Sequence, residues 1–195
     1  MFAFLRWLIA LPLVLVFPAR IRGLRNLHIR KGGMLVCNHT SYADPFVLAA
    51  YTLRPIHFVA KSEFFENRAF GRLLYWLGAF PIKRDSADIK AIKQCIKVVK
   101  QNKVLGIFPE GTSKGHTEGM VSEMKRGVAL IALKSRVPIT PVLIAKKARP
   151  FRIQDLRAGA PFTLDDLYDK RLTNEVLDEA AGRIMAALNG QGDAR

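Results

Sequence analysis

Short apolar runs alternate along the chain with longer segments in which apolar residues recur every three or four positions. Runs of four to eight apolar residues are typical of buried strands, and the longer spacing is typical of helices that bury one face. The predicted strands cover residues 34–38, 56–60, 79–82, 104–108 and 137–144. The predicted helices cover residues 44–51, 62–77, 88–101, 121–135 and 174–188. Strands that alternate with helices predict a single α/β domain with a mixed, largely parallel sheet flanked by helices.

The first residues of the chain follow a different pattern. Residues 1–18 are apolar apart from Arg6, and a basic cluster follows, formed by Arg20, Arg22, Arg25, Arg30 and Lys31. A straight helix of this length would rise about 27 Å, just short of a hydrocarbon core of about 30 Å, and Pro12 would kink or break it. We interpret residues 1–19 as a retained, membrane-associated helical segment that dips into one leaflet, followed by a domain over residues 20–195.

Two alternatives for this N-terminal segment stay open. It is nearly long enough to span the membrane, and it also resembles a cleaved signal peptide. Against the signal peptide, Arg6 alone makes a weak basic start, and residues 16–19 make a poor small-residue cleavage site.

Charge narrows the classes of partner. The 195 residues include 31 Lys and Arg against 16 Asp and Glu, a formal net charge of +15. So large an excess predicts an anionic partner: a phospholipid surface, a nucleic acid or an acidic small molecule. Cys37 and Cys95 lack metal-ligand spacing, and we expect both to be buried, reduced thiols. No nucleic-acid motif with interleaved aromatic residues is present, so nucleic acid is the weaker alternative.

Candidate chemistry begins where the first predicted strand ends. The segment Asn38–Pro45 places His39 five residues before Asp44. A neutral imidazole can accept a proton from a hydroxyl near neutral pH, and a carboxylate bound to its other nitrogen fixes the tautomer. The structural alternative is that Asp44, which precedes Pro45, serves as the N-cap of the next helix.

Two further segments follow other predicted strands. Glu110, Gly111 and Thr112 offer a carboxylate, a flexible backbone and a hydroxyl, which suit a polyol or a phosphate; an ordinary strand-to-loop turn is the alternative. Arg84 follows the strand predicted over residues 79–82. It suits bidentate binding of a phosphate, and a solvated surface arginine is the alternative.

Together these segments resemble the glycerolipid acyltransferases, most closely the bacterial lysophosphatidic acid acyltransferases. The segments that carry the resemblance, in chain order, are 38–44, 60–63, 78–84, 108–112, 125–127 and 137–142. The resemblance extends from about residue 20 to residue 188, nearly the whole chain. Two positions depart from the family pattern: Ser113 and Lys114 follow Thr112 where an arginine is frequent, and Lys83 stands where an Asp or Asn is frequent.

The resemblance implies an O-acyltransferase of phospholipid biosynthesis that makes phosphatidic acid from lysophosphatidic acid. It implies His39 and Asp44 as the catalytic pair. It also implies that Lys61, Arg84, Glu110, Gly111 and Thr112 bind substrate. The donor would be acyl-CoA or acyl carrier protein, with no cofactor and no metal, and the expected location is the cytoplasmic face of the cell membrane, monotopic or peripheral.

Two alternative functions remain at this point. One is the acylation of another lyso-lipid acceptor. The other is a non-catalytic basic protein that binds membranes or nucleic acid, for which the lysines of the helix predicted over residues 88–101 would serve. The His39–Asp44 pair separates the alternatives, because binding alone needs basic charge but does not need that pair.

Overall fold

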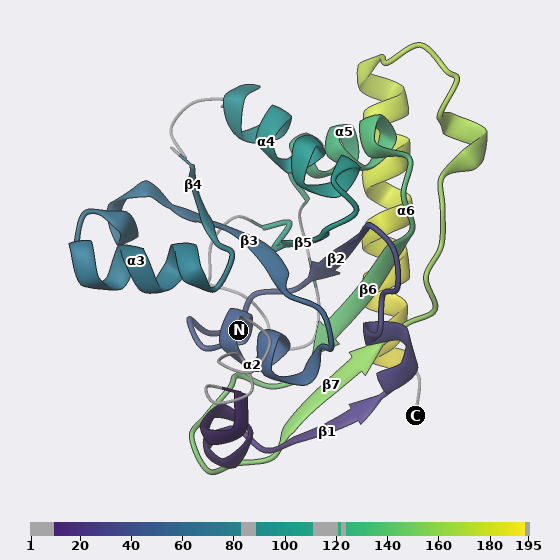
Figure 1. Ribbon diagram of the computed structural model, residues 1–195. Helices are drawn as coiled ribbons and strands as arrows, with labels where there is room; N and C mark the ends of the chain where they lie inside the picture. The colour runs from purple at the N-terminus through teal and green to yellow at the C-terminus, as the bar shows by residue number, and fades with distance from the viewer. Residues whose placement is uncertain (1–9, 83–88, 111–120, 122–123, 194–195) are drawn as a thin grey trace.

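The fold is a single sheet covered by helices on both faces (Figure 1). The computed structural model describes residues 10–82, 89–110, 121 and 124–193. The strands are β1 (Ala19–Arg22), β2 (Gly33–Cys37), β3 (Ile56–Lys61), β4 (Phe80–Ile82), β5 (Val104–Ile107), β6 (Ile139–Ile144) and β7 (Gln154–Ala158). The helices are α2 (Asp44–Tyr51), α3 (Arg68–Trp76), α4 (Ile89–Lys100), α5 (Arg126–Ser135) and α6 (Asn174–Asp193), with 3₁₀ turns η1 (Leu24–Leu27), η2 (Ser62–Phe65) and η3 (Asp165–Leu167).

Strand order confirms the predicted class of fold. Across these ranges the sheet runs β1-β7-β6-β2-β5-β3-β4. Each neighbouring pair is parallel except β6 and β7, which are antiparallel. The protein is therefore an α/β domain with a mixed, largely parallel sheet.

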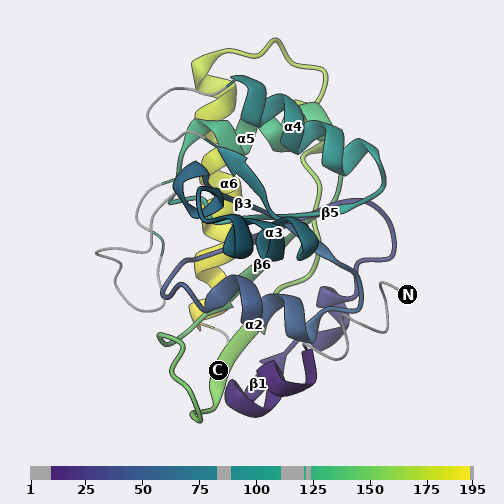
Figure 2. The same cartoon turned by 60° about the vertical axis from the view of Figure 1, so that its left-hand side comes forward.

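The alternation of side chains along β2 divides the core into two layers. Met34 and Val36 pack with α4, α5 and α6, whereas Leu35 and Cys37 pack with α2 on the opposite face. Figure 2 shows the sheet between these two layers. Because both faces are covered, β2, β5 and β6 are fully buried, which explains why they are continuous apolar runs in the sequence.

Strands β1 and β7 were not predicted. Their sequences, ARIR and QDLRA, mix charged with apolar residues, and every second residue is more buried than its neighbours. In β7 the intervening residues Asp155 and Arg157 lie on one side and form an ion pair of 3.2 Å. The alternation of polar with apolar residues was the available signal in the sequence, but it is weak over four or five residues.

The helix predicted over residues 62–77 is wrong as one unit. The chain forms η2 first, and α3 begins only after Asn67. The Asn67 side-chain oxygen accepts hydrogen bonds from the backbone N–H of Ala69 at 3.1 Å and of Phe70 at 3.0 Å. Asparagine is among the preferred N-cap residues, so it begins a new helix here.

The helix predicted over residues 121–135 begins late, at Arg126. Val121 is buried and bound to α6 instead: its N–H donates to the Asn189 side-chain oxygen at 2.8 Å, and the Asn189 amide donates to its carbonyl at 3.0 Å. This contact joins residues 68 positions apart, which a local pattern does not reveal.

The N-terminal prediction is tested only in part. Residues 10–16, which include Pro12, are helical, and residues 1–9 lie outside the described ranges. Among the described helices, none combines the length and the apolar character needed to cross a bilayer. The division into a segment over residues 1–19 and a domain over residues 20–195 stays a prediction.

Candidate active site

The predicted site residues follow the carboxyl ends of neighbouring parallel strands. Strand β5 lies between β2 and β3, and all three point the same way. Their carboxyl ends therefore meet at one edge of the sheet, where ligands of open α/β sheets usually bind. His39 follows β2, Glu110 follows β5, and Lys61 is the last residue of β3.

Asn38 fixes the chain as it leaves β2. Its side chain is buried, its amide donates to the carbonyl of Ile144 at 2.9 Å, and its oxygen accepts from the N–H of Ile144 at 2.7 Å. These two bonds extend the pairing of β2 with β6 by one residue through a side chain. Asn38 therefore sets the position from which His39 leaves the sheet.

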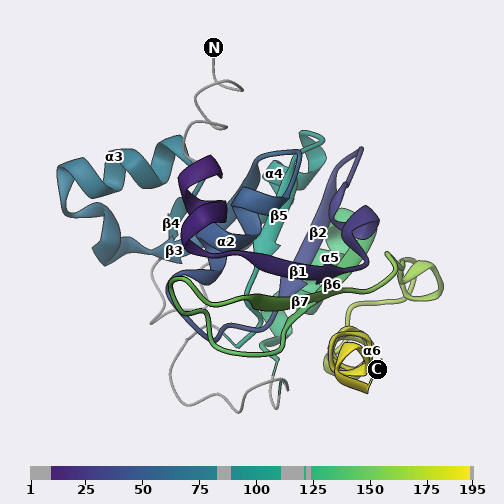
Figure 3. The same ribbon diagram turned by 90° about the horizontal axis from the view of Figure 1, so that it is seen from below.

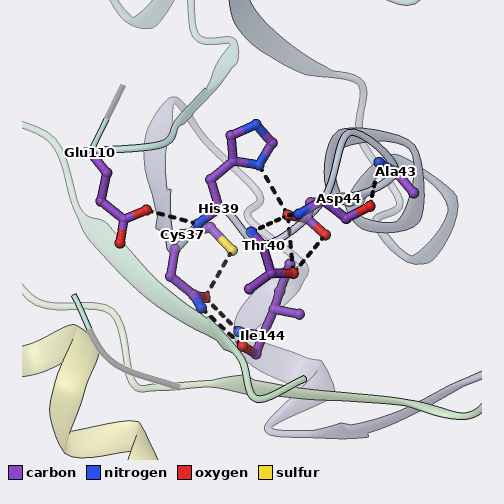
Figure 4. A network of polar contacts seen from close by, with 9 residues as sticks. Cys37, His39, Thr40, Ala43, Asp44, Glu110 and Ile144 are labelled. Carbon is purple, nitrogen blue, oxygen red and sulfur yellow. Dashed lines mark hydrogen bonds and ion pairs between the residues drawn. The ribbon is translucent and has the colours of Figure 1, made fainter. Parts of the chain in front are cut away.

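His39 and Asp44 form the pair that the sequence predicts. The Nδ1 atom of His39 lies 3.0 Å from Oδ2 of Asp44, and both side chains are buried (Figure 4). An ionised carboxylate only accepts hydrogen bonds, so Nδ1 carries the proton in this contact and Nε2 keeps a lone pair. The second ring nitrogen lies on the side of the ring away from Asp44 (Figure 4).

The carboxylate of Asp44 also binds the loop between β2 and α2. Its Oδ2 atom accepts from the backbone N–H of Thr40 at 2.6 Å and of Ser41 at 2.7 Å. The Thr40 hydroxyl donates to the same carboxylate at 3.3 Å. These donors offset the cost of burying the charge.

The alternative of Asp44 as the helix N-cap is wrong. Ala43 occupies the N-cap position, Asp44 is the first residue of α2, and Pro45 follows it. The carboxylate turns back toward the preceding loop rather than forward to the first turn of the helix. Its hydrogen bonds therefore orient His39.

Aromatic packing holds the other side of the imidazole. The rings of His39 and Phe108 are stacked with centroids 4.2 Å apart, and Phe108 stacks on Phe58 at 5.6 Å. Gly106 makes room for this stack, because a Cβ there would lie 2.4 Å from the Phe58 ring. Sequence reasoning missed Phe58 and Gly106; the glycine inside an apolar strand was the available signal.

Glu110 joins the loop after β5 to the loop after β2. Its Oε2 atom accepts a hydrogen bond from the backbone N–H of His39 at 3.2 Å (Figure 4). The carboxylate thus lies beside His39, but on the backbone side and not at the ring.

Cys37 is the other reactive side chain close to the pair. Burial raises the pKa of its thiol well above the usual value, and the nearby charges of Asp44 and Glu110 raise it further. The thiol is therefore protonated and a poor nucleophile at neutral pH. Cys37 and Cys95 are both free and buried, as predicted.

The structure places only some of the predicted substrate-binding residues. Lys61 lies at the same edge of the sheet, with its Nζ atom 3.9 Å from a carboxylate oxygen of Glu63. Arg84, Gly111 and Thr112 lie outside the described residues, as do Lys83, Ser113 and Lys114. Within the part of the chain that is described, no group of three or more His, Cys, Asp or Glu side chains is arranged to hold a metal ion.

Exposed aromatic residues adjoin the pair on the outer side. Tyr42 packs edge-on to His39 at 6.5 Å and to Phe64 at 6.2 Å, and Phe64 packs edge-on to Phe70 at 6.3 Å. Tyr42 is 64% exposed. Sequence reasoning gave Tyr42 no role and placed Phe64 and Phe70 only in the helix predicted over residues 62–77.

Proteins of similar sequence carry the name of an acyltransferase. The chain is 33% identical to the 1-acyl-sn-glycerol-3-phosphate acyltransferase of Bacillus subtilis over 117 residues. This aligned segment covers 60% of this chain and 57% of the relative. It is 33% identical over 159 residues to the enzyme of the same name from Streptococcus pneumoniae, which covers 77% of this chain and again 57% of the relative. The chain thus spans less than two thirds of the length of these curated relatives.

A solved structure shares the fold. The crystal structure of the 1-acyl-sn-glycerophosphate (LPA) acyltransferase PlsC from Thermotoga maritima matches with a TM-score of 0.70 and 18% identity, over 99% of this chain and 81% of that one. The family profile described as Acyltransferase matches residues 18–145, a range that runs from β1 to the end of β6 and includes the buried His39–Asp44 pair. From this match we conclude that the chain belongs to the Acyltransferase family.

Proposed function

We propose that this protein is an O-acyltransferase that transfers an acyl chain from a thioester to the free hydroxyl of lysophosphatidic acid, giving phosphatidic acid. The observation that carries the proposal is the buried contact of 3.0 Å between His39 and Asp44 at the carboxyl edge of the sheet. The names of the relatives, 1-acyl-sn-glycerol-3-phosphate acyltransferase, support the choice of acceptor.

The mechanism is general base catalysis without an enzyme nucleophile. Nε2 of His39 accepts the proton of the acceptor hydroxyl as its oxygen attacks the thioester carbonyl. Asp44 stabilises the imidazolium that forms. The tetrahedral intermediate then collapses: the new C–O bond stays, the C–S bond breaks, and His39 returns the proton to the leaving thiol. Neither a metal nor a cofactor takes part in these steps.

Substrate binding is proposed for residues after several strands. Lys61 supplies a cation at the end of β3, and Glu110 supplies a carboxylate next to the backbone of His39. The resemblance adds Arg84, Gly111 and Thr112 as partners for the phosphate and glycerol. Holding the acceptor in this way makes the encounter of hydroxyl and base effectively intramolecular.

The proposal also specifies the acyl donor and the location of the protein. The donor is acyl-CoA or acyl carrier protein, both anionic and both matched to a chain of net charge +15. The protein acts at the cytoplasmic face of the cell membrane, held as a monotopic or peripheral protein by its apolar first residues and the arginines that follow. Nucleic acid is not a partner in this proposal.

The test compares the wild-type full chain with His39→Ala in detergent micelles that contain lysophosphatidic acid and acyl-CoA or acyl carrier protein. Wild type should form phosphatidic acid, and the variant should lose about 10²-fold or more of kcat, because the base is gone. His57→Asn is the matched control, since His57 lies on β3 with its Nδ1 atom bound to the Gly78 carbonyl.

Three results would contradict parts of this proposal. A folded His39→Ala protein with full activity would remove His39 from the mechanism. Activity of wild type only with a different lyso-lipid would retain the base and move the acceptor. If neither wild type nor variant acylated any lyso-lipid, the non-catalytic basic protein would be the better description.

A further inference from the structure

The loop between β6 and β7, residues 145–153, exposes two large apolar side chains. Phe151 is 77% exposed and Ile153 is 74% exposed, more than any other large apolar residue in the described ranges. Neither side chain contributes to the core, so the fold gives no reason for apolar residues at these positions.

The loop is held in one conformation by buried polar contacts. Gln154 is 2% exposed, and its side-chain amide donates to the carbonyl of Arg149 at 2.9 Å and to that of Arg152. The backbone N–H of Arg152 also donates to the Arg149 carbonyl at 3.3 Å. These hydrogen bonds inside the loop fix the position of Phe151 and Ile153 relative to the sheet.

The backbone of Phe151 is in an uncommon conformation. Its φ angle is +58°, in the left-handed region that bulky residues rarely adopt. An asparagine or glycine would fit there at lower cost. Because the ring is exposed and the core does not require it, the cost of this conformation supports a role for Phe151 outside the fold.

The chemistry of the loop selects one class of partner. Residues 145–153 include no Asp or Glu. The cations of the loop are all exposed: Lys146, Lys147, Arg149 and Arg152. Aromatic and aliphatic tips flanked by lysines and arginines are typical of surfaces that enter the headgroup region of an anionic bilayer.

The position of the loop agrees with this partner. Strand β6 runs parallel to β2 and ends at Ile144, the residue that binds Asn38 next to His39. The loop therefore leaves the sheet at the same edge as the His39–Asp44 pair. The N–H of Phe151 donates to the Val16 carbonyl at 2.6 Å, which ties the loop to the helical residues 10–16 (Figure 3).

Those helical residues extend the same surface. Leu11 is 64% exposed and Leu15 is 69% exposed. Two segments more than 130 positions apart thus expose apolar side chains at one edge of the sheet.

We propose that residues 145–153 form a second membrane-docking element. Phe151 and Ile153 enter the boundary between headgroups and acyl chains, and the loop cations bind lipid phosphates. Together with residues 10–16, the loop turns the edge that holds His39 toward the bilayer, the source of a lyso-lipid acceptor. This inference rests on the proposed location at an anionic membrane and does not rest on acyl transfer.

Vesicle binding of the full chain tests the apolar part of the surface. We expect Phe151→Ser with Ile153→Ser to lower the partition coefficient onto vesicles of phosphatidylcholine and phosphatidylglycerol by about tenfold, because two apolar contacts with lipid are lost. Leu24→Ser with Leu172→Ser is the matched control, since both residues are exposed elsewhere, and it should bind as wild type does. Equal binding of wild type and the loop variant, or an equal loss in both variants, would overturn the proposal.

Charge is tested with a second pair of variants. Arg149→Gln with Arg152→Gln should weaken binding to vesicles with phosphatidylglycerol and leave binding to pure phosphatidylcholine unchanged. Lys93→Gln with Lys97→Gln removes the same charge from exposed positions of α4. If the two pairs weakened binding equally, net charge would explain the binding and the loop would have no special role.

A fluorescent probe tests insertion directly. An environment-sensitive dye on Phe151→Cys should shift its emission to the blue when vesicles are added, and the same dye on Leu172→Cys should not. The native thiols are buried, which directs labelling to the introduced cysteine. A bound protein with no shift at position 151 would overturn insertion.

Light scattering without lipid tests the competing occupant, a second copy of the chain. A wild-type dimer that the Phe151→Ser and Ile153→Ser changes dissociate would overturn membrane docking. Acylation in detergent micelles is measured separately, so failure of the loop proposal and failure of the proposed reaction give different results.

Discussion

At the residue scale, the carboxylate of Asp44 fixes the orientation of the His39 ring. Asp44 accepts hydrogen bonds from the His39 ring, from the backbone N–H groups of Thr40 and Ser41, and from the Thr40 hydroxyl. The tautomer of His39 and the path of the loop therefore depend on the same two oxygen atoms.

Asp44→Asn tests this dependence. We expect kcat to fall by about 10²-fold or more with a smaller change in KM, because the amide neither stabilises an imidazolium nor fixes the tautomer. Unfolding should also become easier by about 1–3 kcal/mol, since an amide replaces a charged acceptor of several donors. Kinetics are measured below the unfolding temperature of both proteins. A variant that loses stability but keeps kcat would show that Asp44 is only structural.

At the element scale, β5 positions the aromatic support of the site. Gly106 in β5 lets the Phe58 side chain from β3 lie across the strand, and Phe58 in turn stacks on Phe108. The support of His39 thus depends on β3 and β5 as well as on the loop that carries it.

Gly106→Ala should disturb this support. The new methyl group would lie 2.4 Å from the Phe58 ring and 2.6 Å from Ile56, so side chains must shift, at a cost of about 1–3 kcal/mol of unfolding free energy. Gly182→Ala in α6 is the control, since nothing lies within 4 Å of its Cβ position, and it should be neutral or slightly stabilising. Urea unfolding of both variants measures the difference. Equal stability of the two would show that Phe58 has room to move.

His57, on β3, should make the free energy of unfolding depend on pH. Burial lowers the pKa of His57 below its ordinary value, although its bond to the Gly78 carbonyl opposes the shift, and Lys103 lowers the pKa further. The unfolded chain therefore takes up this proton at higher pH than the folded chain. The contribution of His57 to the free energy of unfolding is complete above about pH 6.5 and is lost as pH falls below it.

His57→Asn isolates this contribution because asparagine does not titrate. Urea midpoints at about pH 5 and about pH 7.5 should differ less in the variant than in wild type. An identical difference in both proteins would assign the pH dependence to other groups.

At the scale of the whole molecule, the proposed membrane docking combines charge with apolar surface. The net charge of +15 attracts anionic lipid over a distance that salt shortens, from about 10 Å at 0.1 M to about 3 Å at 1 M. Apolar contacts at the carboxyl edge of the sheet do not depend on salt in this way.

Binding to vesicles that contain phosphatidylglycerol should therefore weaken by about tenfold or more between 0.1 M and 1 M salt and then level off above zero. Sedimentation with vesicles over a salt series measures both parts. Complete release at high salt would leave no apolar component, and binding that salt did not change would leave no electrostatic one.

The fold could be predicted furthest where both faces of an element are buried. Strands β2, β5 and β6 are continuous apolar runs, and α4 has a regular apolar stripe, so local pattern locates them. The pattern failed at β1 and β7, whose charged residues face one side, and at residues 62–77, where Asn67 begins a new helix inside an apolar segment.

The candidate site, like the fold, could be predicted from the sequence only in part. The spacing of His39 and Asp44 suggested the pair, and the later segments that carry the family resemblance were needed to predict it, because a His five residues before an Asp is a weak signal alone. Whether Asp44 served the helix or the histidine was not decided by spacing, since both uses need a carboxylate at the start of a helix.

By itself, the sequence determined the class of fold, the strong positive charge and the residues able to act as base and partner, because these depend on composition and local pattern. The tertiary structure alone decided that Phe108 and Phe58 support His39, that Asn38 binds Ile144, and that the loop before β7 lies at the same edge of the sheet as His39. Each of these contacts joins distant parts of the chain. The order of strands in the sheet brings those parts together, and no local pattern specifies that order.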